Sequence, residues 1–372
     1  MLMAIAIDTR WLHVKAGVAN QIIGLMGGLA QCDQEHNYLS FGINPGIKQD
    51  NFQHYDLSGW RRKIYQGLWK TLRFPPLEFL LGEQQLVHFT NATMVPVRSA
   101  RTKLVLTVHD LAFLHFPEAI ERRNLRFLQE FCPPAIQRAD RIVAVSQSTK
   151  NDIVNKFGVQ EEKIVVIPNA AAGNFQPQDP ERCRIIIQER YQVAKPYLLF
   201  VGTMEPRKNV TLLLAACEQL APELQQVYAL VLIGMKGWQQ SGLQHAIAKL
   251  QEKMTVITPG YISQEELPLF YGAAKLFVFP SLFEGFGIPA LEAMACGTPV
   301  LVANNSSLPE VVGEAAMLFA NNNVADLKEK LLILLKDNQL REQMRAKGFQ
   351  QAQKFSWLAS GKKLRDLYAE LL

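Results

Sequence analysis

The sequence predicts an α/β protein of two doubly wound domains, each a parallel sheet covered by helices. Short runs of β-branched and aromatic residues alternate with helical stretches in both halves, which is typical of parallel sheets. The length of 372 residues exceeds one ordinary core and suits two domains of roughly 150 to 190 residues each. Between the halves, Pro168 to Pro196 is a loop-rich stretch in which prolines, asparagines and a glycine break the periodicity.

Strands are expected at ten places along the chain. In the first half they are 3–8, 86–89, 103–108, 141–145 and 163–167, and in the second half they are 196–202, 228–233, 254–257, 276–279 and 299–303. The carboxyl ends of the strands in a doubly wound sheet line a crevice. Residues directly after these runs are therefore the first candidates for ligand binding.

The domain boundary is predicted after residue 175. Residues 1–175 form the N-terminal domain and 176–357 the C-terminal domain, with a short helix at 181–191 in the second. After Asp326 the chain reads as helices to the end. Phe355 to Trp357 introduces the last helix, 358–372.

The composition excludes several classes of protein. Hydrophobic residues make up 48% and charged residues 20%, and the net charge of +5 is too mild for a nucleic-acid binder. Five scattered cysteines without a C-x-x-C pair favour reduced thiols in a cytoplasmic protein over a disulfide framework or a zinc site. Residues 1–8 read as a buried strand and not as a signal peptide, and no run approaches the roughly 20 apolar residues that span a bilayer.

The most informative motif places two carboxylates, Glu284 and Glu292, eight positions apart around a glycine turn and a helix start. Pro289 suits the first turn of a helix that Gly297 ends, so Glu292 lies about one turn inside it. The backbone N–H groups of residues 285–288 then point from a positive helix end towards a phosphate or hydroxyl. An alternative interpretation is that Phe286 and its apolar neighbours are core, that Glu284 is a helix-start carboxylate and that Glu292 is solvated.

A second motif runs from Val201 to Asn209, directly after one expected strand and before an expected helix at 210–220. It contains Arg207 and Lys208, and two adjacent cations beside a helix start suit a diphosphate, the arginine as a planar fork and the lysine as a point charge. The alternative is a solvated basic turn.

Three further candidates follow other expected strands. Gly17 lies in a loop after the first strand and permits close approach of a phosphate, and His109 closes the strand at 103–108. Pro259 to Tyr261 gives a surface against which a nucleobase can rest. Taken singly, a histidine beside a strand end is more often structural, and the tripeptide is a turn.

Together these motifs resemble the retaining glycosyltransferases of the GT-B fold, specifically those of family 4. The resemblance spans nearly the whole chain and rests on the glycine loop at 16–18, His109 and Asp110, Pro206 to Asn209, Pro259 to Tyr261, the Glu284 and Glu292 pair, and the closing helix. Family members often carry a second glycine and an arginine near the first loop, where this chain has Lys15, Ala16 and Asn20. No acceptor is therefore inferred from that loop.

The resemblance implies two Rossmann-like domains facing a central cleft, with the donor held by the C-terminal domain and the last helix packing back on the N-terminal, acceptor domain. It also implies roles for individual residues: Glu292 on the ribose, Arg207 and Lys208 on the diphosphate, Glu284 with the Gly285, Phe286, Gly287 and Ile288 backbone on the transferred hexose, His109 on the sugar, Gly17 on the distal phosphate, and Tyr261 beside the base.

The chain contains no Asp-x-Asp pattern, which is the usual carboxylate pair for a magnesium-bound diphosphate. Neither a metal nor another cofactor is therefore expected, and Arg207 and Lys208 would stabilise the leaving group. The resemblance implies retention by attack from the face of the departing phosphate. UDP-glucose and GDP-mannose are the expected donors, with a slight preference for UDP-glucose on metabolic abundance.

Residues 60–74 carry five basic and no acidic residues. Written as a helix, Ile64, Leu68 and Leu72 share one face, so the segment can lie on an anionic bilayer. An equally good interpretation is a core-facing helix with solvated charges. On the first interpretation the acceptor is a lipid-linked saccharide of polysaccharide or lipopolysaccharide assembly, and the protein is cytoplasmic, on the inner face of the plasma membrane.

The alternatives to a transferase are a sugar-nucleotide epimerase or hydrolase, and a non-catalytic nucleotide-sugar-binding module.

Overall fold

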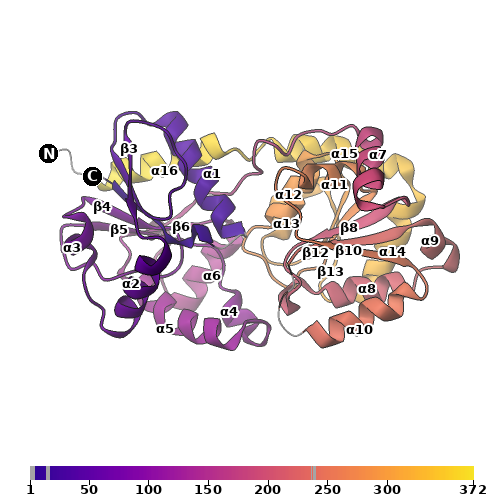
Figure 1. Ribbon diagram of the computed structural model, residues 1–372, viewed down its shortest axis with the longest axis horizontal. Coiled ribbons are helices and arrows are strands. Elements are labelled where there is room, and N and C mark those ends of the chain that lie inside the picture. Colours follow the sequence, from indigo (N-terminus) through magenta and orange to yellow (C-terminus); the bar gives the residue numbers. More distant parts are fainter. Residues whose placement is uncertain (1–4, 14–16, 236, 238–239) are drawn as a thin grey trace. The chain divides into compact units, whose positions relative to one another are not determined.

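The computed structural model of the protein describes residues 5–13, 17–235, 237 and 240–372. The chain divides into two compact units (Figure 1). Unit 1 comprises the described residues up to Phe113, then Arg122–Ala170 and Phe355–Leu372, and unit 2 comprises Leu114–Glu121 and Ala171–Lys354. Each unit holds one parallel sheet with helices packed around it, so the predicted fold class is confirmed.

The sheet of unit 1 has, within the described residues, seven parallel strands in the order β3-β2-β1-β4-β5-β6-β7. Its strands are β1 Ile5–Thr9, β2 Tyr38–Gly42, β3 Phe52–Asp56, β4 Leu86–Phe89, β5 Lys103–Val108, β6 Arg141–Ala144 and β7 Ile164–Val166. Its helices are α1 Gly17–Cys32, α2 Gly59–Thr71, α3 Leu77–Leu81, α5 Arg122–Arg138, α6 Gln147–Phe157 and α16 Trp357–Leu371. The direction of winding reverses between β1 and β4.

The sheet of unit 2 has six parallel strands within the described residues, in the order β10-β9-β8-β11-β12-β13. Its strands are β8 Tyr197–Val201, β9 Ala229–Ile233, β10 Thr255–Gly260, β11 Leu276–Phe279, β12 Val300–Asn304 and β13 Met317–Ala320. Its helices are α7 Pro180–Tyr191, α8 Val210–Glu218, α9 Pro222–Val227, α10 Gln240–Gln251, α11 Leu267–Ala273, α12 Ile288–Ala295, α13 Leu308–Val312, α14 Val324–Lys336 and α15 Asn338–Ala352. Here the winding reverses between β8 and β11.

Three strands were not predicted, and all lie at or next to a sheet edge. β3 and β13 are edge strands with partly exposed residues, and β2 mixes Ser40 and Gly42 into its apolar run. β2 and β3 therefore lack the near-continuous apolar run that marks the centre of a parallel sheet, whereas β13 is apolar but only four residues long. β10 extends to Gly260, beyond the predicted end at 257, through an irregularity in its pairing with β9.

One segment lies in a different unit from the residues on either side of it. Leu114–Glu121, which includes the end of α4 Ala112–His115, belongs to unit 2 and not to residues 1–175 as predicted. The reason is aromatic packing far along the chain, since the His115 ring stacks on Phe283 with centroids 4.8 Å apart and Phe116 lies 6.2 Å from the same ring.

The last helix, α16, packs on α1 within unit 1 (Figure 1). Ser356 caps its start by accepting from the Ala359 N–H, and Leu364, Leu367 and Tyr368 enter the core beneath the sheet. The hydroxyl of Tyr368 lies 2.6 Å from His88 Nδ1, and Nε2 of the same ring lies 2.8 Å from the Thr107 hydroxyl. Among the described residues, no helix combines the length and the apolar character needed to span a membrane.

Candidate functional site

The switch point of unit 2 brings two loops side by side, because β8 and β11 are neighbours in the sheet although 74 residues lie between the end of β8 and the start of β11. The loop after β8 contains the short turn Pro206–Lys208, and the loop after β11 leads through Glu284 into α12. A backbone hydrogen bond of 2.8 Å, from the Leu282 N–H to the Arg207 carbonyl, ties the loops together. Side chains of both loops therefore meet at the carboxyl edge of the sheet.

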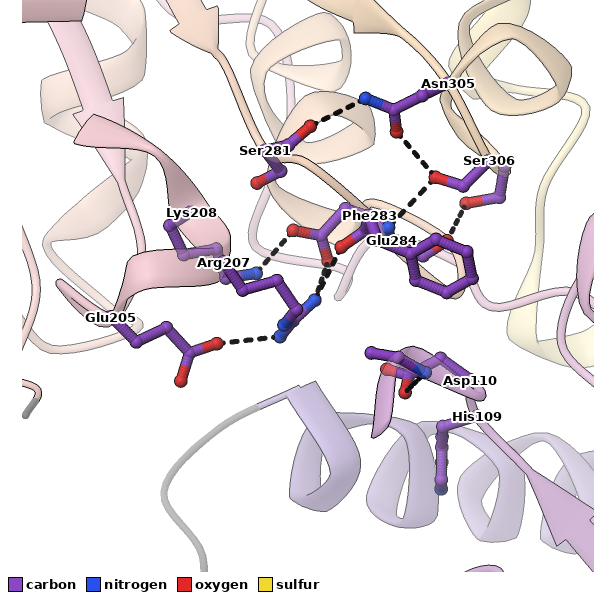
Figure 2. A network of polar contacts seen from close by, with 12 residues as sticks. His109, Asp110, Glu205, Arg207, Lys208, Ser281, Phe283, Glu284, Asn305 and Ser306 are labelled. Atoms are coloured by element: carbon purple, nitrogen blue, oxygen red, sulfur yellow. Dashed lines mark hydrogen bonds and ion pairs between the residues drawn. The ribbon is translucent and has the colours of Figure 1, made fainter. Parts of the chain in front are cut away.

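Arg207, Lys208 and Glu284 form one cluster, in which Glu284 is buried and both cations are partly buried (Figure 2). Lys208 Nζ donates to Glu284 Oε1 at 2.6 Å, and Arg207 Nη1 donates to Glu284 Oε2 at 3.2 Å. Burial alone would raise the pKa of the Glu284 carboxyl, but the charges of Lys208 and Arg207 outweigh it and hold the pKa below its usual range. Glu284 is therefore ionised at neutral pH, and the structure groups the three residues that the sequence singled out.

Glu205 is a member of this cluster that the sequence patterns did not predict. Its carboxylate accepts from Arg207 Nη2 at 2.8 Å, while Arg207 Nη1 also donates to the Phe283 carbonyl at 2.7 Å. The guanidinium is thus fixed in direction by the loops after both strands. A carboxylate two residues before a candidate arginine was the sequence feature that could have indicated this role.

A second group, Asn305, Ser306 and Ser307, holds the Glu284 loop from the end of β12 (Figure 2). The Glu284 N–H donates to Ser306 Oγ at 2.9 Å, and Ser307 Oγ donates to the Glu284 carbonyl at 2.9 Å. Asn305 Nδ2 donates to the Ser281 carbonyl at 2.8 Å, and Asn305 Oδ1 accepts from Ser306 Oγ at 2.8 Å. These residues position the loop through its backbone, a role that no sequence motif had indicated.

The turn before α12 requires a glycine at 287. Its φ is +97°, and a Cβ there would come within 2.6 Å of the Leu308 side chain. Phe286 and Ile288 are buried, so their side chains belong to the core and only their backbone groups remain as candidates for donor binding. The apolar residues of the motif are therefore core, as the alternative interpretation has it, but Glu292 is buried and not solvated; the binding roles of the motif stay predictions.

Glu292 lies inside α12 and is buried. The Tyr271 hydroxyl donates to its Oε2 at 3.1 Å, and burial raises the pKa of the Glu292 carboxyl to about 7. The two carboxylates of the motif are therefore held in different ways, Glu284 between two cations and Glu292 in an apolar setting. Different pKa values for paired carboxylates are typical of sites in which each has its own task.

Tyr261 directly follows β10, which is an edge strand of the sheet of unit 2. One strand, β9, lies between β10 and β8. Its side chain is exposed, and Pro259 and Gly260 are the end of the strand and not a turn beyond it. The structure thus places Tyr261 on the same carboxyl edge as the cluster but separates the two by β9.

The candidates of unit 1 are His109 and Gly17. His109 Nε2 donates to the Thr90 carbonyl at 2.9 Å, so Nδ1 is the nitrogen left as acceptor in the neutral ring. Burial lowers the pKa of the imidazole, against the opposing effects of the Thr90 carbonyl and Asp110. Gly17 is exposed and begins α1, whereas Lys15 and Ala16 of the predicted loop lie outside the described residues.

In the part of the chain that the structure describes, no three His, Cys, Asp or Glu side chains lie close enough together to bind one metal ion. The expectation of a metal-independent protein stays a prediction. All five cysteines are free.

Family models match both halves of the chain: "Glycosyltransferase Family 4" over residues 16–171 and "Glycosyl transferases group 1" over residues 184–351. O-antigen chain mannosyltransferase B of Escherichia coli is 36% identical over 256 residues, which are 68% of this chain and 67% of that protein. O-antigen chain mannosyltransferase RfbU of Salmonella typhimurium is 28% identical over 67% of this chain and 68% of its own length. The serotype-specific mannosyltransferase WbdA of Escherichia coli is 32% identical, but the chain spans only about a third of it.

Solved structures agree in fold. Anabaena HepE, in complex with UDP and glucose, superposes with a TM-score of 0.74 at 18% identity over 99% of both chains. WaaG, a glycosyltransferase involved in lipopolysaccharide biosynthesis, gives 0.75 at 16% identity over 98% of this chain and 99% of its own. With both units matched by family models and a relative above 30% identity, the chain belongs to the family 4 glycosyltransferases of the GT-B fold.

Proposed function

We propose that this protein is a retaining hexosyltransferase that needs no metal ion and moves a hexose from a nucleotide sugar to a saccharide acceptor in polysaccharide or lipopolysaccharide assembly. The observation that supports this most directly is the Arg207, Lys208 and Glu284 cluster at the switch point of unit 2. Two cations on a rigid loop there suit a diphosphate leaving group.

Mannose from GDP-mannose is the first choice of donor. Mannosyltransferases are among the relatives at 28 to 36% identity, beside D-inositol 3-phosphate glycosyltransferases at 29 to 30%, whereas the HepE complex with UDP-glucose is only 17% identical. The slight preference for UDP-glucose from metabolic abundance therefore yields to GDP-mannose. The O-antigen names of two relatives support a lipid-linked saccharide as acceptor, at the inner face of the plasma membrane.

Glu284 has two successive partners in this proposal. Without donor, the two cations are balanced by Glu284 and Glu205. When the diphosphate arrives, Arg207 and Lys208 turn to its oxygens, and the released Glu284 carboxylate accepts hydrogen bonds from the hexose hydroxyls. After the exchange the two cations are paired with the diphosphate and the Glu284 carboxylate is hydrogen-bonded, so no charge of this site is left without a partner.

In the transfer itself, the acceptor hydroxyl attacks the anomeric carbon from the face that the diphosphate is leaving. The carbon–oxygen bond to the diphosphate breaks with its electron pair going to that oxygen, which also takes the acceptor's proton. Arg207 and Lys208 stabilise the charge that grows there. Glu292 would bind the ribose, the backbone of residues 285–288 the hexose, His109 the sugar, Gly17 the distal phosphate and Tyr261 the base.

The first test is donor binding by thermal shift, with GDP-mannose, UDP-glucose, GDP and UDP, each in EDTA and again with Mg²⁺. GDP-mannose at 100 times its Kd should add about 2.7 kcal/mol to stability without metal. Turnover with an oligosaccharide acceptor, followed by NMR, should give an α-linked product from the α-linked donor. A β-linked product would refute retention, and stabilisation only with Mg²⁺ would refute metal independence.

The Arg207→Lys variant tests the leaving-group role. It keeps the charge but loses the planar fork, so kcat/KM should fall by about 10- to 100-fold, the range expected for one or two charged hydrogen bonds. Arg190→Lys is the matched control, because Arg190 forms an exposed ion pair with Glu266 elsewhere in unit 2. Equal activity of both variants would contradict the role. Hexose release at the same rate with and without acceptor would favour a hydrolase.

A further inference from the structure

Five large apolar side chains lie exposed close together in sequence, on α2, α3 and the loop between them in unit 1. Their exposed fractions are 69% for Trp60, 50% for Ile64, 67% for Leu72, 49% for Phe74 and 76% for Phe79. With the exposed cations Arg61, Lys63, Lys70 and Arg73 they form what is called here the α2–α3 surface. Isolated exposed hydrophobic residues are ordinary, but a group of this size marks an interaction surface.

The inner face of α2 is a different set of residues. Trp69 is buried, its Nε1 donates to the Pro75 carbonyl at 2.8 Å, and the Arg10 guanidinium lies 5.2 Å from its ring. Trp69 therefore anchors the helix to the sheet. The interpretation of α2 as a core-facing helix is wrong for Ile64 and Leu72, which the core leaves in solvent.

The charge on this surface has one sign. From residue 57 to residue 77 the chain has five basic and no acidic side chains. The next carboxylate, Glu78, is engaged with the backbone, since it accepts from the N–H groups of Arg98 at 2.7 Å and Ser99 at 2.6 Å. Asp56, which directly precedes this stretch, interacts electrostatically with Arg61. The stretch as a whole still carries an excess of positive charge beside its exposed apolar groups.

The basic character continues onto α5, which lies beside α2 in Figure 1. Lys70 Nζ is 5.7 Å from the Phe127 ring centre, so the two helices touch. The first turns of α5 expose Arg122 and Arg126. Cations therefore extend over two helices of the same unit.

We propose that the α2–α3 surface binds an anionic phospholipid bilayer. The aromatic and aliphatic side chains would enter the interface between headgroups and acyl chains, and the cations would contact the headgroups. Exposed tryptophan, phenylalanine and aliphatic side chains among lysines and arginines suit this partner, because the acyl chains accept the apolar groups and the anionic headgroups attract the cations. If the surface binds a bilayer, unit 1 would also meet a lipid-linked acceptor there. This consequence rests on the proposed function, whereas the binding of the bilayer does not.

Flotation with vesicles of phosphatidylcholine, with and without phosphatidylglycerol, tests the proposal on the full chain. Wild type should float with anionic vesicles and be released by salt. Leu72→Ser/Phe79→Ser and Arg61→Gln/Lys63→Gln/Arg73→Gln should each weaken partitioning by about tenfold or more, because both apolar burial and charge contribute. All these residues are exposed, so the variants should fold, which circular dichroism checks.

Two control variants carry the same chemical changes elsewhere. Ile185→Ser/Val227→Ser removes exposed apolar groups of unit 2, and Lys156→Gln/Lys336→Gln/Lys347→Gln removes three exposed cations. Both should float like wild type. The proposal would be overturned if wild type floated equally well with and without phosphatidylglycerol. It would also be overturned if the control variants lost as much flotation as the variants of the α2–α3 surface. Turnover with a soluble acceptor should be unchanged in every variant, which separates failure of this surface from failure of the proposed function.

Discussion

The Glu292 carboxyl links pH to the stability of unit 2. Its pKa is raised by burial from 4.5 to about 7, so the folded state retains a proton that the unfolded chain releases. The stabilisation by this proton is complete below about pH 4.5 and is lost as the pH rises through 7. A Glu292→Gln variant has no such dependence at this position.

The expected result follows from the size of the shift. Relative to Glu292→Gln, wild type should lose about 2 to 3 kcal/mol of unfolding free energy between pH 5 and pH 8, at about 1.4 kcal/mol per pKa unit. Urea denaturation of both proteins at the two pH values measures it. A difference between the proteins that stays constant with pH would show that the carboxyl titrates normally.

Sequence patterns could predict the charged residues of the site but not the residues that position them. Arg207, Lys208 and Glu284 follow strands whose apolar runs are plain in the sequence, and parallel strands bring their carboxyl ends to one edge. Glu205 and Ser306 act through single hydrogen bonds between loops, and such bonds leave no periodicity. The roles of the site residues towards donor and acceptor stay predictions.

At the scale of elements, the contact of α1 with α16 depends on glycine at 28. A Cβ at Gly28 would come within 1.9 Å of the Trp357 carbonyl oxygen, and one at Gly361 would meet the backbone of Gly28. The two helices therefore approach more closely than any larger residue permits. Gly27, the neighbouring position on α1, has nothing within 4 Å of such a Cβ.

These neighbours give a matched pair of variants. Gly28→Ala should lower the free energy of unfolding by about 1 to 3 kcal/mol, the usual effect of overpacking. Gly27→Ala should leave it unchanged or raise it by up to about 1 kcal/mol, because alanine favours the helix. Guanidinium denaturation compares the two, and equal stability would mean that the helices separate to accommodate the methyl group.

The central strands of both sheets could be predicted from the sequence because of their burial. β4, β5, β8 and β11 lie inside their sheets, so nearly every residue is buried and the apolar run is continuous. Edge strands and the placement of Leu114–Glu121 depend on partners distant in sequence, such as Phe283 for His115. Local patterns carry no information about such partners.

On the scale of the whole molecule, unit 1 is built from segments that flank unit 2 in the sequence. Its last segment supplies α16, whose Leu364, Leu367 and Tyr368 complete the core cluster. Unit 2 takes nothing from beyond Lys354. The two units should therefore respond differently to loss of this helix.

A chain ended after Lys354 tests that difference. Amide hydrogen exchange should show β1, β4 and β5 losing most of their protection, while β8, β9 and β11 keep theirs, because only unit 1 loses part of its core. A synthetic peptide of residues 355–372 should restore protection in unit 1. Retained protection in β4 and β5 without the peptide would contradict the dependence on α16.

The same arrangement affects how the chain folds during synthesis. Ala170, the last residue of unit 1 before unit 2, and Trp357, the first of α16, are roughly 190 residues apart. At usual translation speeds the ribosome needs roughly ten to forty seconds to cover that distance. Throughout this time the face of unit 1 that receives Tyr368 is uncovered on the nascent chain, whereas unit 2 has all its segments as soon as Lys354 has been added. The unit synthesised second is therefore the first that can complete its fold, and chaperones that bind nascent apolar surfaces should be found on the other.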